Sequence, residues 1–201
     1  MLKSLQSKLA PTLYVQLGSR EIRITNVATA KVLSEPTLMA LETDAKGVKQ
    51  VLAVGREASA LPLGAGRILV NPFDHPRMLV ADFALAEKCL QLMLKKVAGK
   101  GLLSASPKVI MHPMEKLEGG LTQVGHRVMR ELALGAGAHA VCVYTGAPLV
   151  AQQLDFAALK RAEAEMLGLA MPTRRGGLSS GAVMLLSLAA MGLLLWLRSQ
   201  S

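Results

Sequence analysis

Aromatic residues and cysteines are scarce in this chain of 201 residues, and each shortage excludes a class of function. The aromatics are one Trp, two Tyr and three Phe, or 3% of the chain. Proteins that bind single-stranded nucleic acid usually stack its bases on aromatic side chains, so nucleic acid is disfavoured as a partner. The two cysteines, Cys89 and Cys142, sit within apolar patterns, which predicts buried free thiols in a reducing compartment.

The sequence also lacks a metal-binding pattern and a secretory signal. Its four histidines show no spacing typical of metal ligands. The first 12 residues contain neither a continuous apolar stretch nor a small-residue cleavage site. We therefore expect no metal site, no bound cofactor and no cleaved leader.

Acidic residues are missing altogether after residue 172, and the longest uncharged run lies in the same region. The 22 residues from Gly176 to Leu197 carry no charge. At ~1.5 Å rise per residue, a helix of this length reaches about 33 Å, enough to cross a hydrocarbon core of roughly 30 Å. We predict a hinge at 172–177 and a transmembrane anchor at 178–197, with Trp196 at the membrane interface. A buried core helix is the alternative.

Basic residues predict how this anchor is oriented. Lys160, Arg161, Arg174 and Arg175 precede the apolar run, and only Arg198 follows it. The positive-inside rule then places the body of the protein on the cytoplasmic side of a single-pass anchor. The whole chain carries 23 Lys and Arg against 14 Asp and Glu, a formal net charge of +9, which suits an anionic lipid surface.

The N-terminal segment 1–11 is a second candidate for membrane contact. Its apolar residues Met1, Leu2, Leu5 and Leu9 recur every three or four positions, with lysines between them, until Pro11 ends the pattern. A short amphipathic helix of this kind can lie in a lipid interface. A frayed leader, or a helix packed on the body, fits the same pattern equally well.

The body, 12–171, shows the alternation of an α/β domain. Strands are predicted at 13–17, 21–27, 31–42, 51–55, 68–72, 107–113 and 140–144, and longer helices at about 82–99, 115–134 and 148–168. Asp82 precedes the first of these helices as a candidate N-cap. The second is expected to bury a stripe of Leu117, Leu121, Val124, Val128 and Leu132. This order predicts a mixed sheet flanked by helices.

Several stretches of the body form a recognisable series. They are LYVQLGS (13–19), VLSEPTLMAL (32–41), VLAVGREA (51–58), VADFALAEKCLQ (80–91), SPKVIMHP (106–113) and RELALGAGAHAV (130–141). In this order and spacing, the sequence from Met1 to about Leu154 resembles the first half of MreB, the bacterial actin homologue that guides cell-wall synthesis in rods. The resemblance implies a single actin-like, ribonuclease H-like lobe.

The sequence departs from this family at the family's phosphate-binding hairpin. The family's Asp before Leu-Gly is Gln16 here, followed by Gly18 and Ser19. A neutral amide holds the water shell of a metal ion less well than a carboxylate does. Residues 145–148 read TGAP, without the acid that positions the hydrolytic water in the family, and the family's second lobe is not recognisable after about Leu154. We expect a degenerate phosphate loop, no catalytic residues and no ATP hydrolysis by this chain alone.

Two membrane-contact features of the family have counterparts here. The resemblance assigns its N-terminal amphipathic helix to Leu2, Leu5 and Leu9, and its apolar membrane-inserting loop to Leu102 and Leu103. The alternative for the latter pair is a hydrophobic staple over the neighbouring helix.

Anchor and resemblance together lead to a functional hypothesis. We expect a membrane-anchored, non-hydrolysing accessory or regulator of the actin-like cytoskeleton at the bacterial inner membrane. Its partners would be lipid and a full-length MreB-type filament or another envelope-assembly protein. One alternative is half of a split actin-like ATPase or nucleotide switch, completed in trans. A decayed fragment is another, against which the intact apolar faces argue.

Overall fold

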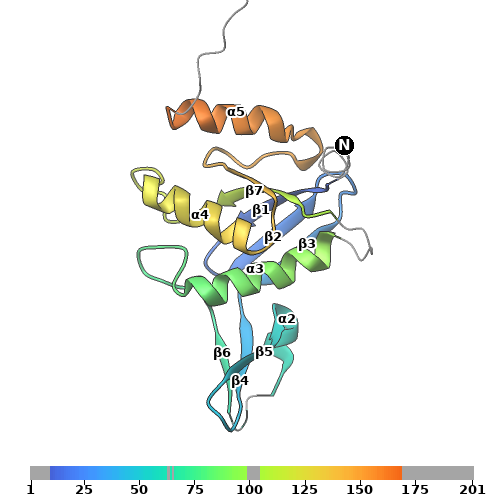
Figure 1. Ribbon diagram of the computed structural model, residues 1–201, viewed down its shortest axis with the longest axis vertical. Helices are drawn as coiled ribbons and strands as arrows, with labels where there is room; N and C mark the ends of the chain where they lie inside the picture. The colour runs from blue at the N-terminus through green and yellow to red at the C-terminus, as the bar shows by residue number, and fades with distance from the viewer. Residues whose placement is uncertain (1–9, 63, 65, 99–104, 169–201) are drawn as a thin grey trace, which may run out of the picture. The chain divides into compact units, whose positions relative to one another are not determined.

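The computed structural model describes residues 10–62, 64, 66–98 and 105–168 (Figure 1). The chain divides into two units, residues 1–166 and 167–201, and the fold below is that of the first. Several predicted features lie outside the described residues: the segment 1–9 with Leu2, Leu5 and Leu9, the pair Leu102 and Leu103, and the hinge and anchor with Trp196. No helix in the described ranges has the length and apolar character needed to cross a membrane.

A five-stranded mixed sheet forms the centre of this unit. Its strands are β1 (Thr12–Leu17), β2 (Glu21–Asn26), β3 (Val32–Pro36), β7 (Lys108–Pro113) and β8 (Ala140–Val143), in the spatial order β3-β2-β1-β7-β8. β1 runs antiparallel to β2 and parallel to β7, which is itself parallel to β8. The predicted mixed sheet is therefore confirmed.

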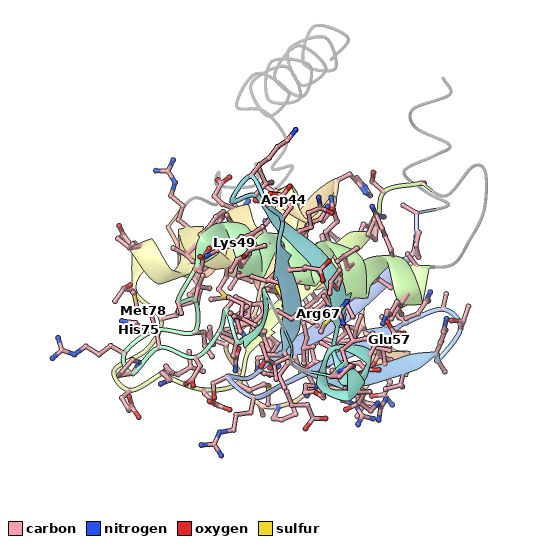
Figure 2. The ribbon with its side chains drawn as sticks, turned by 90° about the horizontal axis from the view of Figure 1, so that it is seen from below. Asp44, Lys49, Glu57, Arg67, His75 and Met78 are labelled. Carbon is pink, nitrogen blue, oxygen red and sulfur yellow. The ribbon has the colours of Figure 1, made fainter. Side chains whose placement is uncertain are left out.

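A second, smaller sheet was not expected. It consists of β4 (Met39–Thr43), β5 (Lys49–Val54) and β6 (Arg67–Val70) in the antiparallel order β5-β4-β6, with the short helix α2 (Arg56–Ala60) after β5. Figure 2 looks onto this sheet from below, with Arg67 on β6 and Glu57 on α2. The segment predicted to be extended at 31–42 forms two strands, because the chain leaves the large sheet after Pro36 and enters the small one at Met39.

Glu35 ties the two sheets together. Its Oε2 accepts a hydrogen bond from the backbone N–H of Arg56 at 2.8 Å, and its Oε1 accepts one from the Arg56 guanidinium at 3.1 Å. Gly55 lies directly beneath the carboxylate with φ of 72°. A Cβ at this position would lie 2.6 Å from Glu35 Oε2, so only glycine fits.

The two faces of the large sheet are covered by different helices. Side chains alternate along β1, so that Leu13, Val15 and Leu17 join the main core while Tyr14 joins a second cluster on the opposite face. The main core includes residues of α3 (Phe83–Ala98) and α4 (Gln123–Gly135), which lie side by side in Figure 1. The second cluster is covered by α5 (Phe156–Met166) and the segment before it.

The predicted N-cap role of Asp82 and the predicted burial of two free cysteines are confirmed. Asp82 Oδ1 accepts a hydrogen bond from the backbone N–H of Leu85 at 3.0 Å, which caps α3. Cys89 on α3 and Cys142 on β8 are free and buried. Burial raises the pKa of both thiols to about 12, so both stay protonated and unreactive at neutral pH.

The start of α4 differs from its prediction. The helix begins at Gln123, where Thr122 Oγ1 caps it by accepting from Gly125 N at 3.0 Å. Residues before it form a loop, because Lys116, Gly119 and Gly120 all have positive φ. The predicted stripe is therefore wrong in part: Leu117 and Leu121 precede the helix, and Val124 is 74% exposed. The residues that α4 buries are His126, Met129, Leu132 and Ala133.

The last helix, α5, is shorter than predicted. A 3-10 turn at Ala151–Gln153 precedes it, and Asp155 Oδ1 accepts from the backbone N–H of Ala157 at 2.8 Å. This Asp cap sets the start of the helix at Phe156 instead of about 148.

Two side chains of α5 cover the outer edge of β8, which is the end strand of the large sheet. Lys160 Nζ donates to the carbonyl oxygen of Val141 at 2.6 Å, and Glu163 Oε1 accepts from the backbone N–H of Val143 at 3.0 Å. These two backbone groups would otherwise be available to a further strand. The side chains of α5 therefore take up two of the outward backbone groups of this sheet edge.

Candidate functional site

The carboxyl ends of the parallel strands define the candidate site. β1, β7 and β8 all end at the same edge of the large sheet, because they are parallel and in register. Three connections meet there: the β1–β2 hairpin tip at 18–20, the loop at 114–121 and the segment after β8 at 144–150. Ligand sites in open α/β sheets usually form at this edge.

The hairpin tip holds two of the three predicted phosphate-loop residues, Gly18 and Ser19. The backbone N–H of Gly18 donates to the carbonyl oxygen of Glu21 at 2.9 Å, which closes the turn. The carbonyl oxygen of Ser19 accepts from Thr37 Oγ1 at 2.7 Å and from Asn71 Nδ2 at 2.8 Å. The tip is thus fixed from the side of the small sheet, and its carbonyl is directed away from the open edge.

Glu115, from the loop after β7, occupies the other side of the tip. Its Oε2 accepts a hydrogen bond from Ser19 Oγ at 2.7 Å. Its Oε1 would lie 2.9 Å from a Cβ placed on Gly18, so the carboxylate packs directly against the glycine. The hydroxyl and the open glycine face, which a phosphate would use, are both in contact with a carboxylate instead.

Gln16, the third predicted residue, lies just below the tip on β1. Its register partners are Arg23 on β2 and His112 on β7. Its side-chain amide contacts the Met114 thioether, with 3.9 Å between Nε2 and Sδ. Gln16, Gly18 and Ser19 thus lie together as neighbours on one hairpin. The side chains of Gln16 and Ser19 and the Cα of Gly18 all contact other protein groups.

These residues do not fit the magnesium nucleotide that the family resemblance implies. Magnesium is usually held through carboxylates and phosphates, and the amide of Gln16 faces a thioether. Within the described residues, the carboxylate in contact with the tip is that of Glu115, and it accepts the Ser19 hydroxyl itself. Nowhere in the described part of the chain do three or more His, Cys, Asp or Glu side chains group as metal ligands would.

A buried hydrogen-bonded chain lies behind the site, on the second face of the sheet. Tyr14 and His112 are joined by a 2.6 Å hydrogen bond from the hydroxyl to Nδ1. His112 Nε2 lies 3.0 Å from the carbonyl oxygen of Gly146, which can only accept. Nε2 is therefore the protonated nitrogen, and burial lowers the pKa of His112, which favours the neutral ring with Nδ1 as the acceptor. The backbone N–H of Leu149 donates to the Tyr14 hydroxyl at 3.2 Å.

This chain fixes the segment 145–148, in which the sequence lacks the family's acid. Gly146 and Leu149 are hydrogen-bonded to side chains of β7 and β1, as described above. The segment is thus held against the sheet by hydrogen bonds between its backbone and the side chains of His112 and Tyr14.

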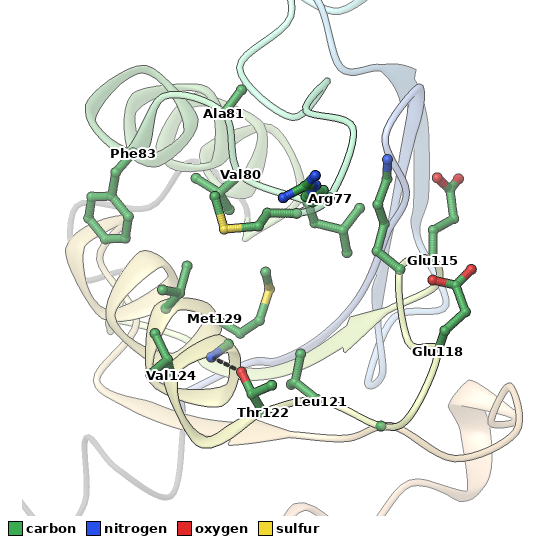
Figure 3. Close-up of a pocket in the computed structure, with 16 residues that line it drawn as sticks. Arg77, Val80, Ala81, Phe83, Glu115, Glu118, Leu121, Thr122, Val124 and Met129 are labelled. Carbon is green, nitrogen blue, oxygen red and sulfur yellow. Dashed lines mark hydrogen bonds between the residues drawn. The ribbon is translucent and has the colours of Figure 1, made fainter.

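A mostly apolar cavity of about 470 Å³ lies beside the loop at 114–121 (Figure 3). It is formed between the loop before α3 and the first turns of α3 and α4. Among its lining side chains are Met78, Leu79, Val80, Phe83, Leu121 and Met129. Glu115, Lys116 and Glu118 supply its charged rim, so the cavity and the hairpin tip share one loop.

Sequence reasoning missed Glu115, Thr37 and Asn71, the three side chains that fix the hairpin tip. Glu115 is 96 residues from Ser19 and Asn71 is 52 residues from it, so the contacts depend on the tertiary fold. The one available signal is that Glu115 closely follows the strand predicted at 107–113, which the structure pairs in parallel with β1. Side chains that follow neighbouring parallel strands meet at one sheet edge.

Comparison with known sequences gives one family. Residues 10–158 match the family described as MreB/Mbl protein. The chain is 34% identical over 145 residues to the cell shape-determining protein MreB of Escherichia coli K12, and 30% identical over 142 residues to that of Haemophilus influenzae. These matches cover 70% of this chain but only 40% and 39% of the relatives, so the chain corresponds to less than half of their length.

Solved structures agree on the fold. MreB5 of Spiroplasma citri bound to ADP superposes with a TM-score of 0.51 at 18% identity, covering 68% of this chain and 38% of that one. A non-polymerising mutant of MamK bound to AMPPNP gives a TM-score of 0.53 at 14% identity, covering 68% and 41%. At these identities the likeness concerns the actin-like fold alone.

Proposed function

Because the chain belongs to the MreB/Mbl family, we propose that it is a membrane-anchored, non-hydrolysing accessory of an MreB-type filament or a related envelope-assembly system. It would act on the cytoplasmic face of the bacterial inner membrane. The observation that carries the proposal is the combination, in one chain, of the family match over residues 10–158 with an uncharged run of 22 residues from Gly176 to Leu197.

A structural role is favoured over catalysis by the contacts at the hairpin tip. Gln16 replaces the carboxylate of the family's phosphate loop, and Glu115 already contacts Gly18 and Ser19. The segment after β8 has no acid, and Gly146 in this segment bonds His112. A lobe built this way lacks the charged groups that activate water or hold a metal–phosphate pair.

The membrane part of the proposal is supported by the sequence. The length of the uncharged run, the basic pair Arg174 and Arg175 before it, and Trp196 near its end favour a single-pass anchor with a cytoplasmic body. Anchoring raises the effective concentration of the lobe near other proteins at the same membrane. A weak contact with a filament is thereby strengthened without additional interface.

Filament association is the first test. The full chain is expressed with a full-length MreB in rod-shaped cells, and cell width, filament localisation and co-purification are measured. We expect co-purification and a change in width or localisation. A matched control replaces residues 178–197 by an unrelated transmembrane helix of equal length and should behave like the original. Unchanged cells together with no co-purification would contradict the proposal.

Membrane attachment and turnover are tested separately. The full chain should float with vesicles after washing with high salt and alkaline carbonate, and Leu186→Arg with Leu193→Arg should release it. Phosphate release by the full chain with magnesium ATP should stay at background. Steady release by the chain alone would refute the non-hydrolysing role, whereas release that appears only with a second protein would favour a split ATPase.

A further inference from the structure

We infer that the carboxylate of Glu115 covers the tip of the β1–β2 hairpin and prevents phosphate-bearing ligands from binding there. The inference rests on the proposed function, since it names the contact that would prevent this family member from binding nucleotide. It goes further than the replacement of the family's Asp by Gln16, because it states that a second side chain, which can be removed by mutation, blocks the tip.

The first support is the double contact of the carboxylate with the tip. One oxygen accepts the Ser19 hydroxyl at 2.7 Å, and the other packs against the bare Cα of Gly18. A hydroxyl and a glycine with an open face are the groups with which phosphate loops approach a phosphate oxygen. Glu115 thus uses the contacts that such a ligand requires.

Charge is the second support. Glu115 takes part in none of the salt bridges formed within the described residues. The adjacent base, Lys116, places its ammonium on the carbonyl oxygens of His75 and Pro76 at 2.7 and 3.0 Å. A phosphate that approached Ser19 would therefore meet an unpaired negative charge at close range, and like charges at such distances repel even beside water.

The third support is that the backbone on both sides of Glu115 is fixed. Before it, the backbone N–H of Met114 donates to the carbonyl oxygen of Leu17 at 2.8 Å, which continues the β1–β7 pairing. After it, Lys116 adopts φ of 60° and is tied down through its ammonium group. Glu115 is largely exposed, but its main chain is not free to carry it away from the tip.

Removing the charge distinguishes this role from an ordinary surface hydrogen bond. The full chain in detergent micelles is compared with Glu115→Ala and with Glu115→Gln, which keeps the volume but not the charge. Glu118→Gln is the matched control, since Glu118 lies on the same loop and at the rim of the same cavity but forms no hydrogen bond to the tip within the described residues. The probes are inorganic phosphate and magnesium ATP, each titrated separately by calorimetry.

The expected result is a gain of binding in both Glu115 variants. At least one probe should bind Glu115→Ala about tenfold or more tightly than it binds the unchanged chain, with Glu115→Gln also improved and Glu118→Gln unchanged. A gain for phosphate alone and a gain for both probes each support the inference. If the alanine variant fails to fold by circular dichroism, the glutamine variant decides the outcome.

One result would overturn the inference: neither Glu115 variant binds phosphate or magnesium ATP more tightly than the unchanged chain does, whether all three bind or none does. This failure is distinguishable from failure of the accessory role. The titrations contain no filament, whereas the accessory role is measured by co-purification and cell shape.

Discussion

Glu163 on α5 accepts a hydrogen bond from the backbone N–H of Val143 at 3.0 Å, and so joins the last helix to the outer strand of the large sheet. The same carboxylate is bonded to Lys160 at 2.5 Å and to Arg130 of α4 at 3.0 Å. Burial by itself would raise the pKa of Glu163, but the hydrogen bonds from Lys160 and Val143, together with the charges of Lys160 and Arg130, outweigh it and lower the pKa. One buried, ionised carboxylate therefore connects α4, β8 and α5.

Replacing this carboxylate should destabilise the fold strongly. Glu163→Ala leaves a buried N–H without a partner and two bases without their anion, so we expect a loss of about 2–3 kcal/mol in the free energy of unfolding. Urea unfolding of the full chain, followed by circular dichroism, measures it. Glu165→Ala, exposed on the same helix, should stay within about 0.5 kcal/mol of the unchanged chain. Equal effects at the two positions would contradict the assignment.

Tyr14→Phe tests the hydrogen-bonded chain on the second face. The change removes the hydroxyl that serves both His112 Nδ1 and the Leu149 N–H, and should cost about 1–2 kcal/mol. It should also speed hydrogen exchange of the Leu149 amide more than that of amides in β2. Tyr144→Phe, whose ring packs edge-on against His112, serves as the control and should leave Leu149 exchange unaltered.

The stability of the fold should fall in mild acid because of two buried histidines. Burial lowers the pKa of His112, and burial also lowers that of His126 despite the opposing charge of Glu163. The unfolded chain therefore binds protons at a pH where the folded chain does not, so stability is complete above the ordinary value of 6.5 and decreases below it.

Urea midpoints measured between about pH 5 and pH 7.5 should show this slope. His112→Gln should reduce the slope, and the exposed His139→Gln should leave it as in the unchanged chain. A midpoint that rises as the pH drops through this range would show that the sign is wrong.

Alanine substitutions at two glycines distinguish the cost of a strained backbone from the cost of a steric clash. Gly47 and Gly55 both have positive φ, but a Cβ at Gly47 meets nothing within 4 Å, whereas one at Gly55 meets Glu35 Oε2 at 2.6 Å. Gly47→Ala should cost about 1 kcal/mol and Gly55→Ala more than about 2 kcal/mol. Thermal unfolding measures both, and equal losses would show that the contact with Glu35 is unimportant.

Local patterns explain which elements could be predicted. The apolar runs of β1, β7 and β8 and the Asp82 cap of α3 are short-range signals, and each appears where it was expected. The start of α4 could not be found in this way, because Leu117 and Leu121 continue the helical spacing into a loop. The positive φ of Gly119 and Gly120 prevents a helix from continuing through this segment, and the spacing of apolar residues does not reveal it.

The division between the two sheets and the closed hairpin tip needed the tertiary structure. Val32–Thr43 reads as one extended segment, and only the burial of Thr37 beneath Ser19 shows where the chain changes sheets. The sequence placed Gln16, Gly18 and Ser19 together because they are neighbours along one hairpin. The contact of Glu115 with the tip could not be predicted from local spacing, since it follows from the pairing of β1 with β7.

The side-chain cover on β8 also limits how this lobe can associate. Because Lys160 bonds the Val141 carbonyl and Glu163 bonds the Val143 N–H, a foreign strand could use these two groups of β8 only by displacing α5. This side of the lobe is therefore protected from edge-to-edge strand pairing with other molecules. Recognition on that side must then depend on the outer surface of α5.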